Sequence, residues 1–293
     1  MKRTKALKKI AFLAFLAAAS AHSFDWPAKN MEQGQSPFTF SQNRAGAFNQ
    51  SMVLKNAQIA KATDKGRIIA VITESQGDGD WFESPLGNAV IISHDDSLIS
   101  IYGNLSKESA DILLSKSGVQ AGEELGSAAD SAWSENGESG DLEFQIADTS
   151  SKTFINPIIL MPRGLRAPRI STDGILMENQ FGRMYSVSNI RSVPAGAYKL
   201  YKRRQNDITA HKSDIYVNGA EVDRITKEAL KGQDGRLTLT GARGSYSSKD
   251  FYPSEDLEFL GNALLPHGSN TISISLSDIF ENSATTNFNI TGY

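Results

Sequence analysis

Two carboxylates stand two residues apart near the middle of the chain, and among its side chains they are the best placed to do chemistry. Asp141 and Glu143 belong to the run Asp-Leu-Glu-Phe-Gln-Ile. If this run is a strand, alternate residues project from one face, so both carboxylates point the same way. Such a pair can act as the general acid and base of a glycosidase-like reaction or can hold Ca²⁺. Solvated carboxylates on a surface strand are the simpler interpretation.

Other reactive residue types are scarce. The chain has no Cys and only four His among 293 residues. The absence of Cys excludes disulfides, thiolate zinc sites, iron–sulfur clusters and thiol nucleophiles. His94 ends an apolar run and precedes an Asp-Asp turn, so we expect it to be structural.

Residues 1–23 have the features of an export signal. Five basic residues precede a short apolar run, Ile10–Ala19, and small residues follow it. The run is shorter than the roughly 20 residues that a membrane helix needs. Removal of residues 1–23 would leave 25 basic and 33 acidic residues, a formal charge of −8. We therefore expect an exported protein, periplasmic or extracellular, with no membrane span in its mature form and no nucleic-acid partner.

Short apolar runs separated by Gly, Asp, Ser and Asn predict an all-β protein. Hydrophobic residues make up 40% of the chain, which is typical of folded proteins, and its length suits two domains. Residues 24–45 are interpreted as an N-terminal arm with a short strand at Phe38–Phe40, and the first domain as residues 46–162. The strands expected in that domain are Arg67–Ile72, Asn88–Ile92, Leu98–Tyr102 and Leu142–Ile146, with a short helix at Lys107–Ser115.

A second all-β unit is expected after a Pro- and Gly-containing linker at residues 163–169. The dipeptides Asn218-Gly219 and Asp234-Gly235 are typical of tight hairpin turns. The expected strands are Ala197–Tyr201, Ser213–Val217, Arg236–Thr240, Asn270–Leu276 and Thr286–Ile290. Clean alternation of Ile and Leu with Ser in the run 271–276 indicates a sheet buried on one face. We predict an immunoglobulin-like β-sandwich over residues 170–293, without the Cys pair of antibody domains.

Six pieces of sequence in the first domain follow one another in a characteristic order. They are Gly66-Arg-Ile-Ile-Ala-Val, Gly87-Asn-Ala-Val-Ile-Ile-Ser-His94, Ile101-Tyr-Gly-Asn-Leu-Ser106, Gly118–Gly126, Asp141–Ile146 and Asn156-Pro157. This order and spacing resemble the M23 peptidase (LytM, lysostaphin-like) domain over residues 38–162. The resemblance implies a LytM-like antiparallel β domain of the class that cleaves peptidoglycan with one zinc ion.

The positions that match the M23 site carry other residues in this chain. The resemblance places the metal ligands at Asn49, Val53 and Glu143, and the catalytic histidines at Asn104 and Asp141. Valine has no lone pair to donate, an amide is a poor zinc ligand, and one carboxylate does not make a zinc site. An amide also cannot accept a proton near neutral pH, as a catalytic histidine does. We expect no zinc or other cofactor, and no M23 reaction.

Four aromatic residues are the candidate binding groups. Trp81, Phe82 and Trp133 fall in loops that border the groove in the M23 fold, and Tyr102 stands in the third of the six pieces. Aromatic rings at such places can stack on sugar rings or pack a peptide, and they can equally pack against their own domain.

The favoured function is that of an exported, non-catalytic cell-envelope protein. M23 relatives that lack the metal ligands are thought to bind peptidoglycan or to regulate cell-wall hydrolases. The expected partner is therefore peptidoglycan or a cell-wall hydrolase. Two alternatives stay open. One is a divergent M23-family peptidoglycan hydrolase, metalloendopeptidase-like, with an altered site at Asp141 and Glu143. The other is an adhesion or assembly module that acts through the sandwich.

Overall fold

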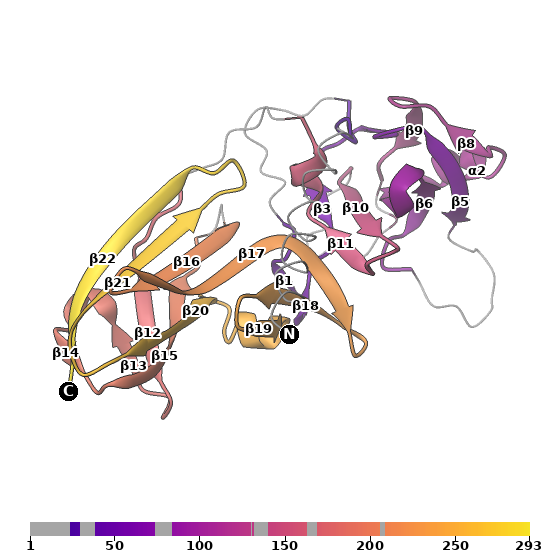
Figure 1. Ribbon diagram of the computed structural model, residues 1–293. Coiled ribbons are helices and arrows are strands. Elements are labelled where there is room, and N and C mark those ends of the chain that lie inside the picture. The colour runs from indigo at the N-terminus through magenta and orange to yellow at the C-terminus, as the bar shows by residue number, and fades with distance from the viewer. Residues whose placement is uncertain are drawn as a thin grey trace, which may run out of the picture.

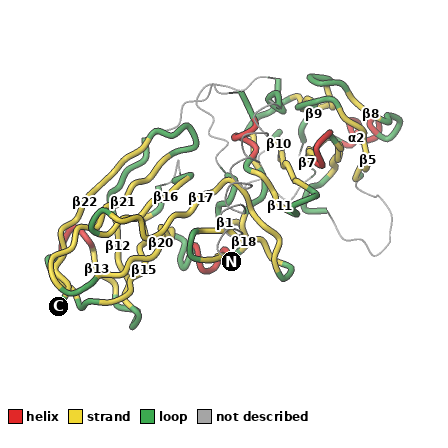
Figure 2. Tube along the Cα trace, in the orientation of Figure 1, coloured by secondary structure: helices red, strands yellow, loops and turns green. Residues whose placement is uncertain are grey.

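A computed structural model describes residues 24–29, 39–73, 84–129, 131, 140–162, 169–205 and 209–293. Within these ranges the chain consists mainly of antiparallel β-strands, with a few short helices between them (Figures 1 and 2). The prediction of an all-β protein is confirmed. The export signal and linker residues 163–168 lie outside the described residues. Among those described, no helix has the length and apolar character needed to cross a bilayer.

The N-terminal unit is built around a sheet in the order β11-β10-β7-β6-β5-β8, and β3 pairs with the start of β10 on the same edge as β11. Its strands are β3 (Met52–Leu54), β4 (Ile59–Lys61), β5 (Gly66–Ile72), β6 (Asn88–Ser93), β7 (Leu98–Leu105), β8 (Gly118–Val119), β9 (Glu124–Ser127), β10 (Leu142–Asp148) and β11 (Thr153–Ile155). Its helices are η2 (Asp95–Ser97), α2 (Lys107–Leu113) and η3 (Pro157–Leu160). The four strands and the helix expected here are all present.

The N-terminal arm folds differently from the prediction. Thr39 and Phe40 lie in a turn, so the strand expected at Phe38–Phe40 is wrong for its two described residues. Ser41 has a φ of 62°, which interrupts extended backbone at this point. The arm instead forms a small hairpin, β1 (Asn43–Arg44) and β2 (Ala47–Phe48), and this pair is called the arm hairpin below.

The C-terminal unit is a sandwich of two sheets around one apolar core. One sheet has the order β13-β12-β15-β20, and the other includes β14-β22-β21-β16-β17. The elements are β12 (Ile175–Asn179), β13 (Met184–Ser186), η4 (Val187–Asn189), β14 (Ser192–Val193), β15 (Gly196–Arg203), β16 (Lys212–Val217), β17 (Ala220–Gln233), β18 (Arg236–Gly241), β19 (Gly244–Ser247), α3 (Ser248–Phe251), β20 (Leu257–Leu265), β21 (Gly268–Ser277) and β22 (Ser283–Gly292). All five expected strands are found. That this sandwich is immunoglobulin-like stays a prediction.

Strand β17 connects the two units. Its first half pairs with β16 inside the sandwich, and Ala229–Lys231 pair with β11 of the N-terminal unit. One hydrogen-bonded sheet therefore runs through both units in the described part of the chain (Figure 1). Sequence patterns did not predict this strand.

A third apolar core fills the junction. Phe40 of the N-terminal arm and Phe48 of the arm hairpin are buried there against residues of β15, β17, β18, α3 and β20. The ring centre of Phe48 lies 5.9 Å from the ring centre of Phe251 and 6.0 Å from that of Tyr252. The hydroxyl of Tyr252 also donates to the carbonyl of Ser41 at 3.0 Å. The arm hairpin is thus held by the C-terminal unit.

Truncation of Phe251 should destabilise the whole chain. Only 1% of this residue is exposed, so we expect Phe251→Ala to lower the free energy of unfolding by about 3–5 kcal/mol. Phe181→Ala is the matched control, because Phe181 is 83% exposed and its loss should change stability by less than about 0.5 kcal/mol. Urea denaturation measures both. Equal stabilities of the two variants would contradict the third core.

Ionisable groups are also buried at the junction. The Lys227 ammonium donates to the Glu258 carboxylate, and both side chains are almost fully enclosed. The ammonium also lies 5.2 Å from the ring centre of Phe251. His211 is close by, since its carbonyl accepts the Lys227 backbone N–H at 2.8 Å. Burial, together with the charge of Lys227, lowers the pKa of His211 to about 4.

The depressed pKa of His211 predicts a loss of stability in mild acid. In the unfolded chain the His211 ring takes up a proton near pH 6.5, and in the folded chain only near pH 4. Because the unfolded state binds the proton more tightly, the free energy of unfolding falls as the pH falls through that window. Between pH 7.5 and pH 5 we expect the wild type to lose about 2 kcal/mol more than His211→Gln. Urea unfolding of both proteins at each pH provides the measurement. Parallel losses would show that His211 does not titrate in this way.

Candidate functional site

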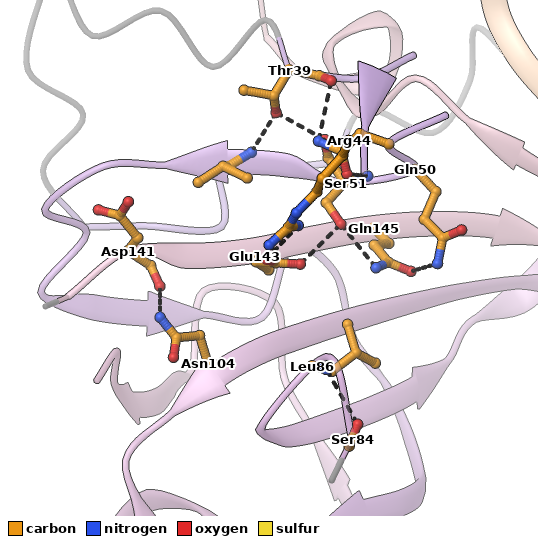
Figure 3. Close-up of polar contacts among 12 residues, drawn as sticks. Thr39, Arg44, Gln50, Ser51, Ser84, Leu86, Asn104, Asp141, Glu143 and Gln145 are labelled. Atoms are coloured by element: carbon orange, nitrogen blue, oxygen red, sulfur yellow. Dashed lines mark hydrogen bonds and ion pairs between the residues drawn. The ribbon is translucent and has the colours of Figure 1, made fainter. Parts of the chain in front are cut away.

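The candidate site lies on the face of β10 that turns away from the N-terminal core. Leu142, Phe144 and Ile146 are fully buried in that core. Because side chains alternate along a strand, Glu143 and Gln145 project from the opposite face. Residues Met52–Leu54 of β3 and the arm hairpin lie near this face, so segments distant in sequence meet there (Figure 3).

The carboxylate of Glu143 is the centre of a hydrogen-bonded network. Arg44 Nη1 donates to Glu143 Oε1 at 2.7 Å, and Ser51 Oγ donates to Oε2 at 3.1 Å. Gln145 Nε2 donates to Ser51 Oγ at 2.9 Å, and Gln50 Nε2 donates to Gln145 Oε1 at 3.4 Å (Figure 3). Only 6% of Glu143 is exposed. Both carboxylate oxygens are therefore engaged by the chain itself.

Two of the positions matched to metal ligands lie close to this network. Val53 is the direct cross-strand neighbour of Glu143, and its backbone N–H donates to Thr39 Oγ1 at 3.0 Å. Asn49 Nδ2 donates to the carbonyls of Thr39 and Ser51, and Asn49 Oδ1 accepts the Ser51 backbone N–H. The structure thus gathers the three matched positions in one region. The Asn49 amide holds the backbone of the arm.

The two positions matched to catalytic histidines contact each other. Asn104 Nδ2 donates to the backbone carbonyl of Asp141 at 2.5 Å, and Asn104 Oδ1 accepts the Ser131 N–H at 2.8 Å. Asp141 Oδ1 accepts the backbone N–H of Asn56 at 3.1 Å. The φ of Asn104 is 63°, a left-handed conformation that asparagine tolerates well. Both side chains therefore fix loops, with Asn104 bound to Asp141 and Ser131 and Asp141 bound to Asn56.

The aromatic candidates give one correction. Trp81, Phe82 and Trp133 lie outside the described residues. Tyr102 has no exposed surface, so its proposed place in a binding groove is wrong. It pairs across strands with Phe144 and shares the core-facing side of the sheet, with the ring centres 5.0 Å apart. Its hydroxyl accepts the Thr63 backbone N–H at 2.7 Å, and burial raises the pKa of Tyr102.

The residues at the matched positions do not fit a zinc ion. Val53 offers no donor atom, the Asn49 amide is bonded to backbone groups, and Glu143 is paired with Arg44. In the described part of the chain, no three His, Cys, Asp or Glu side chains form a group suited to a metal. Both ring nitrogens of His94 lie within hydrogen-bond distance of protein groups, which agrees with the structural role expected for it.

Four residues of the network were not singled out from the sequence, namely Arg44, Gln50, Ser51 and Gln145. Gln145 follows Glu143 at the spacing that puts both on one face, and this signal was present in the strand pattern. Arg44 and Ser51 carry no such signal. They lie 99 and 92 residues from Glu143 along the chain, so only the fold brings them to it.

A protein-family model that carries no functional description matches residues 168–293. No curated protein matches the chain. Among solved structures, the catalytic domain of a mutant of the prophage-encoded M23 protein EnpA from Enterococcus faecalis is similar at 21% identity, with a TM-score of 0.32. That match covers 45% of this chain and 95% of the EnpA domain. A match at this identity and TM-score assigns no chemistry to this chain.

The ion pair between Arg44 and Glu143 should show measurable coupling. Arg44→Met leaves a nearly buried carboxylate without its cation, so we expect a loss of about 1–3 kcal/mol in the free energy of unfolding. The Glu143→Gln variant should lower the free energy of unfolding by less. Adding Arg44→Met to Glu143→Gln should lower it little further. The Lys29 and Glu124 pair is a matched control, since both side chains are more than half exposed and their coupling should be clearly smaller. Additive effects at Arg44 and Glu143 would contradict the pairing.

Proposed function

We propose that this protein is an exported, non-catalytic cell-envelope protein with a degenerate M23 (LytM-like) domain at residues 46–162. In this proposal the domain binds peptidoglycan or regulates a cell-wall hydrolase. The first support is the order of the six sequence pieces. They fall in turn on β5, β6, β7, the segment β8–β9, β10 and the start of η3. Each piece falls on a strand or at a helix start, which supports the proposal.

The observation that carries the proposal is the pairing of Glu143 with Arg44 at a matched metal-ligand position. A guanidinium cannot act as a Lewis acid and stays charged at any physiological pH. Both oxygens of this carboxylate also already accept hydrogen bonds, from Arg44 and Ser51. Among the described residues, this network already engages the carboxylate that a reaction would need, which favours a non-catalytic role over turnover.

The remaining parts of the proposal concern location and the second unit. The basic and apolar pattern of residues 1–23 supports export to the periplasm or to the outside of the cell. We propose that the C-terminal unit is an immunoglobulin-like sandwich that supports the N-terminal domain. Its contacts with Phe40 and Phe48 favour this role, because they fix the arm hairpin over the candidate site.

The proposal is tested with the mature protein, residues 24–293. It should co-sediment with insoluble peptidoglycan or change the rate of a cell-wall hydrolase added to it. It should release no soluble wall fragments, with or without added zinc, and metal analysis should find less than a stoichiometric amount of zinc. Zinc-dependent release of fragments would overturn the non-catalytic assignment. A protein that neither sediments with the wall nor affects a hydrolase would overturn the envelope function.

A further inference from the structure

Strand β22 lies at an edge of the C-terminal sandwich. It pairs with β21 along its whole length, and on its other side β14 pairs with its last two residues. In the described part of the chain, no strand pairs with residues 283–290 on that side (Figure 1). The N–H of Thr291 points toward β14, and backbone groups alternate along a strand, so the N–H groups of Thr285, Asn287 and Asn289 point to the same side. This edge therefore offers a row of backbone donors and acceptors to another strand.

Two other long strands have edges or pairings that discourage a further strand. On β20, the Asp223 carboxylate accepts the N–H of Asn262 at 2.8 Å, and the Ser213 hydroxyl donates to the carbonyl of Leu260 at 2.6 Å. Strand β5 has a register shift, typical of a bulge, in its pairing with β6. Inward-pointing charges and bulges are devices by which proteins block edge-to-edge pairing.

Strand β22 has none of these devices. Its ten residues, Ser283–Gly292, include no charged residue and no Pro, and its pairing with β21 shows no register shift. Lys, Pro or a bulge is common on exposed edges, because a long regular edge otherwise pairs with other chains. Phe288 packs against the core of the sandwich and is only partly buried, so the edge also leaves apolar surface to be covered. These features indicate a surface that receives a strand.

The strand that this edge suits has the properties of β22 itself. Its exposed residues are hydroxyl and amide side chains, among them Thr285, Asn287 and Asn289. Such side chains donate and accept hydrogen bonds, so identical strands can face each other across a two-fold axis. Charged side chains would repel their own copies in that arrangement. Without residues 1–23 the formal charge of the chain is −8, and a neutral edge adds nothing to the repulsion between two copies.

We propose that β22 is a dimerisation edge at which two copies of this chain pair. The two β22 strands run antiparallel about a two-fold axis within residues 283–289, because β14 occupies the edge beyond them. The pairing joins the sandwich sheets of both copies and closes the dimer, since each copy uses its open edge once. This inference goes beyond the proposed function and does not depend on what the N-terminal domain binds.

Sedimentation velocity tests the inference on the mature protein, residues 24–293, at concentrations up to about 100 μM. The wild type should form a dimer whose share rises with concentration. Asn287→Lys places an ammonium group from each copy at the seam, so the dissociation constant of the dimer should rise about tenfold or more. Ser273→Lys is the matched control, because Ser273 is the cross-strand partner of Asn287 and lies one strand away from the edge. It should dimerise as the wild type does.

A wild type that stays monomeric throughout overturns the inference, as do equal dissociation constants for Asn287→Lys and Ser273→Lys. If Asn287→Lys does not fold, crosslinking decides. The chain has no Cys, so one introduced Cys is the only thiol that reacts. A short bismaleimide should join two copies of Thr285→Cys or of Asn287→Cys, and should not join two copies of Ser273→Cys. Equal yields for the edge and control positions overturn the dimer edge.

Discussion

The hydrogen bonding of β17 to strands of both units is the constraint on which the rest of the structure depends. Because β17 pairs with β16 and then with β11, the sandwich and the N-terminal sheet cannot be placed independently. The strand also contributes Ile225 and Leu230 to the third core, into which Phe48 of the arm hairpin packs. The position of Arg44 over Glu143 follows from this packing. The polar network of the candidate site is thus tied to a strand of the other unit.

Much of the fold could be predicted from local pattern. Strands such as β5, β6 and β21 are continuous or alternating apolar runs between turn residues, and the turn at Asn218-Gly219 has the positive φ angles that this dipeptide favours. The strand β17 was missed for a physical reason. Its segment Lys-Glu-Ala-Leu consists of residues that favour helices, and pairing on both edges overrides that preference.

Part of the candidate site could likewise be predicted from the sequence, and part could not. The matched metal-ligand positions Val53 and Glu143 are cross-strand neighbours, and the matched catalytic positions Asn104 and Asp141 share a hydrogen bond. The expectation that Tyr102 lines a groove is wrong. Its neighbour Gly103 is the cross-strand partner of Glu143, so the side chain of Tyr102 faces the opposite side of the sheet, toward the core. The ion pair with Arg44 depends on a contact between residues 99 positions apart, which no local pattern encodes.

The covalent attachment of Arg44 has one further consequence for the site. A metal ion held by a protein exchanges with its surroundings, so an apo form appears whenever the ion is scarce or chelated. The positive charge beside Glu143 is part of the polypeptide and is present as soon as the chain has folded. The charge that Arg44 places beside Glu143 is therefore set by translation alone.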